Sequence, residues 1–303
     1  MESAKNTALK CFSLIDAARN GIIKAVKDSG FMGATHALSA VAIFSAMVAF
    51  IPGFVEWAGF TTVSLFLLGL LVIVGHSLIP DLDNSASTAK SALGIVGQGL
   101  SVFFIGSSKI IQTVVRTRRD DPDPDPHRGF WHTPFAAVGT GLLISLISLI
   151  PGTVALPIVG EVTFGFIIAF VICALSTHLA IAGLFNSFIK KVRKSSAVGE
   201  LVALLISLVV TGLIFANLSH TGDYWWLGVS AALGMLIHTI GDAFTTAGSP
   251  LFFPFTVFFR GKFWWKTRFT PMKAGGAAEK FVMIPIFSLV VVISLGKIIW
   301  GLL

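Results

Sequence analysis

The chain has 303 residues, of which 54% are hydrophobic and 12% charged, and its mean hydropathy is +0.86. This composition excludes an ordinary soluble globular protein. The formal net charge of +7 does not indicate a nucleic-acid partner, because the Lys and Arg residues cluster beside apolar runs, where orientation and anionic lipid headgroups explain them. The two cysteines, Cys11 and Cys173, form no close pair, so a disulfide framework and a thiolate zinc site are also excluded.

The first 30 residues predict a basic amphipathic helix that lies on the membrane surface. Apolar side chains such as Leu9 and Phe12 alternate with Lys10 and Arg19. The segment has neither the continuous apolar core nor the cleavage pattern of a signal peptide. We therefore expect residues 1–30 to form this helix and residues 31–303 to form a single membrane-embedded domain.

Long apolar runs in the rest of the chain predict an all-α, polytopic membrane protein, because about 20 apolar residues are enough to cross a bilayer as a helix. About seven spans are expected, at 35–52, 61–79, 134–151, 161–189, 198–217, 225–244 and 281–301. The segment 92–115 is long enough to span, but its glycines and polar residues leave a re-entrant or surface course open. Residues 250–265 are short and aromatic, which predicts a segment that dips into the membrane interface.

The basic clusters predict the orientation of the chain. Positively charged loops favour the cytoplasmic side, which places the amino terminus, Arg116 to Arg119, Lys190 to Lys194 and Arg260 to Lys273 in the cytoplasm. If 92–115 does not cross the membrane, all the polar clusters described next also emerge on the cytoplasmic face.

Four short polar clusters interrupt the apolar chain, each at the edge of a hydrophobic run where an unpartnered His or Asp is costly. They are Gly33-Ala34-Thr35-His36, Leu78-Ile79-Pro80-Asp81-Leu82-Asp83, His127-Arg128-Gly129-Phe130-Trp131-His132-Thr133 and His238-Thr239-Ile240-Gly241-Asp242. Their shared face predicts one metal site that is assembled from four places in the chain.

Two of the clusters offer carboxylates. His238 and Asp242 are four residues apart on a predicted helix, so both face one side, as in many helical metal sites. A helix cap or an interhelical hydrogen bond is the alternative. Asp81 and Asp83 follow Pro80 in a short loop, where one carboxylate can bind a metal and the other can support it. A helix cap is again the alternative, although a metal ligand is favoured for Asp81.

The third cluster combines two imidazoles with a guanidinium. His127 and His132 suit zinc or another first-row ion, and Arg128 offers the planar fork that recognises phosphate or carboxylate. An anionic substrate, with a phosphoester as the natural choice, follows from this combination. An interfacial anchor formed by Trp131 and Arg128 is the alternative. His36 taken alone is compatible with a cap or a packed polar residue.

In these residues the chain resembles the YdjM-like family of inner-membrane proteins, which are regarded as metal-dependent hydrolases. The likeness covers about residues 31–256 and rests on the four clusters together with Gly248-Ser249-Pro250-Leu251. Trp131 stands where the family pattern has Thr. The family is distantly similar to zinc-dependent phospholipases C, which are all-helical enzymes with His and Asp ligands. The resemblance therefore implies phosphoester hydrolysis.

We expect a membrane-bound hydrolase of a phosphoester or lipid-linked substrate at the cytoplasmic face of the inner membrane, with zinc, or alternatively manganese, as its metal. The expected ligands are His36, Asp81, His127, His132, His238 and Asp242. Asp83 would orient a ligand or act as general base, and Arg128 would bind the anionic group of the substrate. An ion-coupled or proton-coupled transporter or lipid flippase, or a non-catalytic protein with a structural metal, are the alternatives.

Overall fold

The computed structural model describes residues 33–59, 62–84, 87–122, 126–157, 160–192, 196–219, 222–270 and 272–302. Helices dominate this part of the chain, and its only paired strands form one short antiparallel hairpin. The predicted all-α class is therefore confirmed. The amphipathic helix predicted for residues 1–30 lies outside the described residues.

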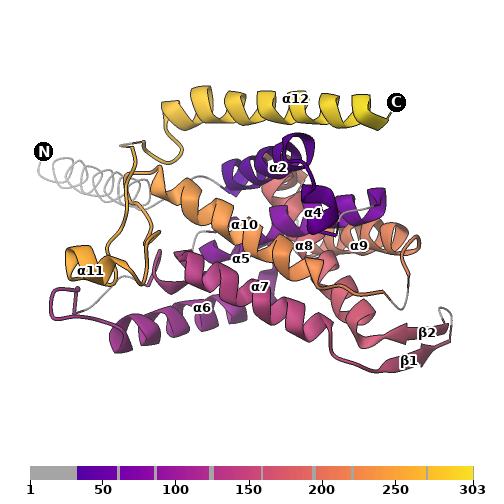
Figure 1. Ribbon diagram of the computed structural model, residues 1–303, viewed down its shortest axis with the longest axis horizontal. Coiled ribbons are helices and arrows are strands. Elements are labelled where there is room, and N and C mark those ends of the chain that lie inside the picture. Colours follow the sequence, from indigo (N-terminus) through magenta and orange to yellow (C-terminus); the bar gives the residue numbers. More distant parts are fainter. Residues whose placement is uncertain are drawn as a thin grey trace, which may run out of the picture.

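The elements follow one another along the chain as Figure 1 labels them. They are α2 (Gly33–Phe50), α3 (Phe54–Trp57), α4 (Val63–His76), the 3-10 helix η1 (Pro80–Asp83), α5 (Thr88–Ala92), α6 (Gly94–Val114), the 3-10 helix η2 (Phe130–His132), α7 (Pro134–Ser148), β1 (Thr153–Leu156), β2 (Gly160–Thr163), α8 (Phe164–Val192), α9 (Ser196–Phe215), α10 (Trp226–Ala243), α11 (Thr256–Arg260), the π-helix η3 (Glu279–Met283) and α12 (Ile284–Leu302).

Six helical segments of the described chain are long and apolar enough to cross a membrane by length and composition. They are Gly33–Phe50, Val63–Asp83, Gly94–Val114, Phe164–Leu184, Trp226–Ala243 and Glu279–Trp300, while Pro134–Ser148 and Leu201–Phe215 are shorter apolar helices. The predicted run 134–151 continues past the end of α7 at Ser148, and the predicted run 161–189 begins before α8, which starts at Phe164. There the β-branched residues of β1 and β2 pair as a hairpin, with Thr153 opposite Thr163.

The undecided segment 92–115 is mostly one continuous helix, α6, so it does not double back as a re-entrant hairpin. Both η1, which precedes α6, and η2, which follows it, contact this helix. The Phe104 and Trp131 rings are 4.3 Å apart, and the Ser108 hydroxyl accepts a hydrogen bond from the backbone N–H of Phe130 at 3.1 Å. The chain therefore returns after α6 to the neighbourhood of η1.

Helix α10 crosses the centre of the molecule and packs against α7, α4 and α2 (Figure 1). Glycines allow this close approach. A Cβ atom on Gly228 would lie 2.0 Å from the Gly141 carbonyl oxygen, and one on Gly234 would lie 2.3 Å from that of Ile73. These crossings fix α10 against α7 and α4, so its C-terminal turns lie beside the end of α4 and beside η1.

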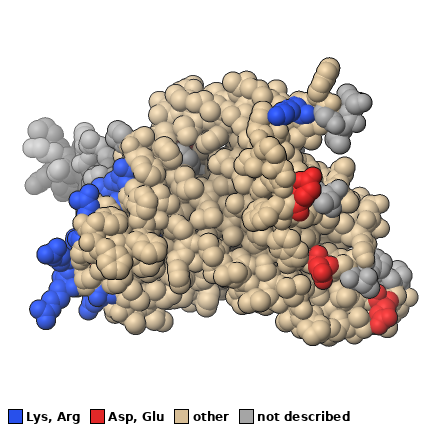
Figure 2. Space-filling view, in the orientation of Figure 1, with Lys and Arg blue, Asp and Glu red and all other residues tan. Residues whose placement is uncertain are grey.

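On the face that Figure 2 shows, charged side chains gather at the two ends of the molecule. In Figure 2, Lys and Arg gather at the left end and Asp and Glu at the right end, with one basic side chain at the upper right. The exposed carboxylates include Glu56, Glu161 and Asp223, while Arg116 and Arg268 are among the exposed cations. This division agrees with basic segments that share one face of a membrane protein.

Candidate metal site

All four polar clusters meet at one place in the structure. His36 lies in the first turn of α2, Asp81 in η1, His132 in η2, and His238 and Asp242 in the last two turns of α10. Pro80 opens η1 after a connection of residues 77–79 that follows α4, and η1 contacts α10. The site is thus made from helix ends, where the backbone changes direction.

Four ligand atoms form the centre of the site. His132 Nε2 lies 3.6 Å from Asp81 Oδ1 and 3.4 Å from Asp242 Oδ2. His238 Nε2 lies 3.6 Å from the same Asp81 oxygen and 3.5 Å from the same Asp242 oxygen. Four ligands held at 2.0–2.1 Å in a tetrahedron around zinc are about 3.3 Å apart. The four imidazole-to-carboxylate distances are close to this value, so the two nitrogens and two oxygens could coordinate one ion.

Several atoms of this centre are buried without a hydrogen-bond partner. His132 Nε2, His238 Nε2 and Asp242 Oδ2 are in this group. A buried polar atom without a partner is costly, and a bound cation would satisfy all three at once. The His and Asp residues form three overlapping groups of three. Within each group the ligand atoms lie within 4.8 Å of one another, so the site could hold a metal ion.

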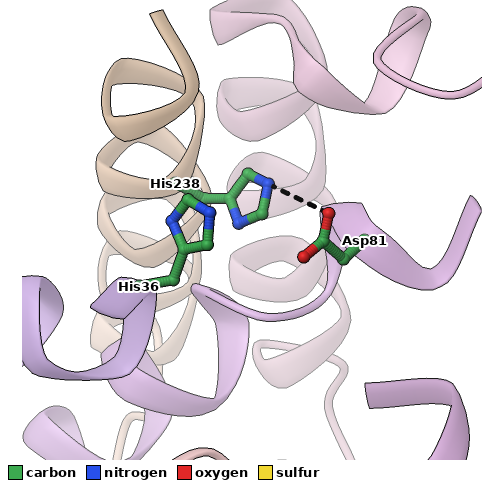
Figure 3. Close-up of side chains that lie close together, drawn as sticks. All are labelled: His36, Asp81 and His238. Carbon is green, nitrogen blue, oxygen red and sulfur yellow. Dashed lines mark ion pairs between the residues drawn. The ribbon is translucent and has the colours of Figure 1, made fainter. Parts of the chain in front are cut away.

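His36 adds a further imidazole to the centre. Its ring stacks on that of His238 with centroids 3.8 Å apart, and its Nε2 lies 3.4 Å from Asp242 Oδ1. Figure 3 shows the two rings side by side, with Asp81 opposite His238. The histidine that was least specific in the sequence is therefore part of the cluster.

A second layer of contacts fixes how the imidazoles point. His238 Nδ1 lies 2.7 Å from the Ser77 carbonyl oxygen, which can only accept, so Nδ1 carries the proton and Nε2 presents its lone pair to the centre. Asp83 Oδ1 accepts a hydrogen bond from His127 Nδ1 at 2.8 Å, and its Oδ2 lies 3.4 Å from His132 Nδ1. Asp83 thus contacts two histidines from behind.

His127 lies at the outer edge of the cluster. Burial lowers the pKa of His127, but the hydrogen bond and negative charge of Asp83 act in the opposite direction and leave that pKa raised above its ordinary value. The contact with Asp83 therefore stabilises the protonated imidazole, in competition with metal binding at the same ring.

Arg128 is buried and faces protein groups. Its guanidinium donates to Asp242 Oδ1 at 2.9 Å, to the Thr245 hydroxyl at 2.9 Å and to the Gly248 carbonyl at 3.1 Å. Its backbone has a φ of 59°, which is unusual for a residue with a side chain. The anion beside Arg128 in this structure is thus Asp242, and contact with an anionic substrate group stays a prediction.

The sequence interpretation missed several partners of the cluster. Thr245 and the carbonyls of Ser77 and Gly248 were not predicted to take part. Only the polar run that ends α10 hinted at Thr245. Gly129 is required by its surroundings, since a Cβ there would lie 2.4 Å from the Ser108 hydroxyl oxygen.

Two other histidines lie apart from the cluster. His76 contacts the Val72 carbonyl and the Ser176 hydroxyl. His178 makes an interhelical hydrogen bond to the Ala92 carbonyl at 2.8 Å. Neither is available as a ligand in this arrangement.

The chain matches the family model described as YdjM inner membrane protein over residues 31–184 and 200–301. Comparisons with the curated proteins and with the solved structures give no match.

Proposed function

The chain belongs to the YdjM inner membrane protein family, and we propose that it is a metal-dependent hydrolase of a phosphoester at the cytoplasmic face of that membrane. The observation that supports this most strongly is the spacing of 3.4–3.6 Å between the imidazole nitrogens of His132 and His238 and the carboxylate oxygens of Asp81 and Asp242. The cytoplasmic amino terminus belongs to the same proposal and is supported by the basic end of the molecule (Figure 2).

The four central residues would hold the first ion, and two neighbours extend the ligand set. Beside the centre, His36 groups with Asp81 and His238, and His127 groups with Asp81 and His132. Because both groups include Asp81, its carboxylate would contribute to either ligand set.

The charges of the cluster favour a divalent cation. Three carboxylates, Asp81, Asp83 and Asp242, face one guanidinium, that of Arg128. With neutral imidazoles the formal sum is −2, which is costly in a buried site and is balanced by one divalent ion. A mixed set of imidazole and carboxylate ligands suits zinc, with manganese as the alternative.

One edge of the cluster is partly exposed. The side chains of Asp81 and His127 are 17% and 13% exposed, whereas those of His132, His238 and Asp242 are at most 1% exposed. Catalytic metal sites keep a position for water or substrate, while structural sites are closed by protein. The exposed edge at Asp81 is where a phosphoester would approach.

The residues around the ion would then have separate tasks. A divalent ion at this position lowers the pKa of a water molecule and polarises a phosphoryl oxygen. Asp83 holds the rings of His127 and His132 in place, a task its contacts favour over that of general base. Arg128 holds Asp242 and compensates part of its charge, so that the carboxylate keeps one oxygen directed at the centre.

Metal analysis of the purified full-length protein tests the site. We expect stoichiometric zinc or manganese in the wild type and its loss in the double variant Asp81→Ala, His238→Ala. The matched control is His178→Gln, which replaces a buried histidine outside the cluster and should keep its metal. Metal content that is unchanged in the double variant would contradict the assignment.

A screen of phosphomonoesters, phosphodiesters and short-chain phospholipids tests the activity. Turnover by the wild type and by His178→Gln, but not by the double variant, supports the hydrolase. Bound metal without turnover of any ester would instead favour a structural metal. Metal-independent movement of lipid or ions across reconstituted vesicles would favour the transporter.

A further inference from the structure

A cavity of about 720 Å³ lies outside the His and Asp cluster, between the end of α6 and the segment 252–269. Its walls combine two kinds of side chain. The cations are Arg260, Lys262, Lys266 and Arg268, and five aromatic side chains, among them Phe259 and Trp265, form much of the remainder. A cavity with both kinds of wall suits a ligand that has an anionic head and an apolar body.

The cavity has a positive formal charge. Two carboxylates, Asp120 and Asp121, also line it, against four cations. Asp120 is buried and accepts hydrogen bonds from the backbone N–H groups of Phe263 and Trp264. These bonds hold the backbone of the cavity wall in place. The remaining excess of positive charge favours an anion, and a phosphate group matches it best among the components of a membrane surface.

Exposed aromatic side chains characterise the short helix α11 beside the cavity. Phe258 and Phe259 of α11 are 85% and 60% exposed, which is typical of a segment that lies at a membrane interface. The Arg260 guanidinium lies 4.7 Å from the centroid of the Trp265 ring, so a cation is held over an aromatic surface at the rim. An apolar chain can therefore extend along the same surface that holds the charged head.

The wall of the cavity is bonded directly to the elements of the metal site. The Thr267 N–H donates to the Ser249 carbonyl and the Phe269 N–H to the Ala243 carbonyl, each at 2.7 Å. Lys266 Nζ also lies 3.5 Å from the His127 carbonyl oxygen. The segment 267–269 therefore lines the cavity and is also hydrogen-bonded to the end of α10.

We propose that this cavity binds the phosphate headgroup of an anionic membrane lipid, with the acyl chains against the aromatic wall. The proposal concerns the segment 252–269 and does not depend on the hydrolase. Its test is a binding measurement that needs neither metal nor turnover, so the two proposals can fail separately.

Calorimetric titration of the purified full-length protein in non-ionic detergent tests the headgroup. The probes are dioctanoyl phosphatidylglycerol, dioctanoyl phosphatidylcholine and inorganic phosphate. The variant Lys262→Gln, Arg268→Gln removes two cavity cations. The control Arg118→Gln, Lys280→Gln removes two exposed cations that do not line the cavity.

We expect the wild type to prefer phosphatidylglycerol to phosphatidylcholine. The cavity variant should bind phosphatidylglycerol about 30-fold more weakly, since each basic side chain near an anionic surface contributes about a factor of five. The control should keep its affinity. Equal loss in both variants, or none in the cavity variant, would overturn the proposal. Inorganic phosphate that binds as tightly as the lipid would overturn the assignment to a lipid.

A second pair of variants tests the apolar wall and guards against a folding defect. Phe259→Gln changes a residue that lines the cavity, whereas Phe258→Gln changes its more exposed neighbour, which does not. We expect weaker phosphatidylglycerol binding only in the first variant. Equal affinities in the two variants would show that the lipid does not lie on this wall.

Discussion

Replacing Asp83 by asparagine removes a negative charge from behind the metal site without changing the shape of the side chain. In the structure Asp83 contacts the Nδ1 atoms of His127 and His132, and it does not belong to the central group of four ligand atoms. If its task is to orient these rings, the Asn variant should still bind metal in the same stoichiometry, but more weakly.

The contacts set the size of this effect. The distance of 2.8 Å to His127 is that of a full hydrogen bond, whereas the 3.4 Å to His132 is longer than an ordinary one. Loss of such an outer carboxylate typically weakens metal binding about 10- to 100-fold, which corresponds to about 1.4–2.7 kcal/mol. We expect Asp83→Asn to fall in this range, because at least one of its two contacts is strong.

Competition between the protein and a fluorescent zinc chelator measures the affinity directly. Asp223→Asn is the matched control, since Asp223 is an exposed carboxylate that precedes α10 and lies outside the cluster, so this variant should leave zinc binding unchanged. Zinc affinity of Asp83→Asn equal to the wild type would refute the orienting role. If hydrolysis were lost at the same time, Asp83 would be the general base instead.

Three further predictions concern stability, measured by thermal or denaturant unfolding in detergent. Arg128→Met leaves Asp242 buried without the guanidinium and should lower the free energy of unfolding by about 3–5 kcal/mol. The exposed control Arg118→Met should change it by less than about 0.5 kcal/mol. Equal effects of the two substitutions would contradict the buried ion pair. Gly129→Ala should cost about 1–3 kcal/mol through overpacking, while Gly139→Ala, with no atom within 4 Å of its added Cβ, should be neutral or stabilising. Removing the metal with a chelator should lower the stability of the wild type by about 2.7 kcal/mol relative to a free ion concentration of 100 times Kd. The variant that lacks two ligands should show no such change, and an equal response would exclude specific binding.

Composition and the spacing of apolar residues were enough to predict the membrane class and most of the helices. A run such as 225–244 is apolar over the length of a bilayer, and the structure places α10 at Trp226–Ala243. Boundaries failed where local chemistry changed within an apolar run. The β1–β2 hairpin is also apolar and β-branched in part, so hydropathy alone extended the predicted run 161–189 into β2, while the run 134–151 passed the end of α7 but stopped before β1.

The sequence by itself also determined which side chains are candidates for the site, because His and Asp at the edge of apolar runs need partners. It could not determine which atoms meet. Asp83 and His132 are joined by contacts between segments that are separated by α6, and Arg128 reaches Asp242 from more than a hundred positions away. Such pairings depend on how α10 crosses α4 and α7. Only the tertiary structure therefore decided that Arg128 faces a carboxylate of the protein and that His36 stacks on His238 beside Asp242, since both follow from long-range packing that has no local signature.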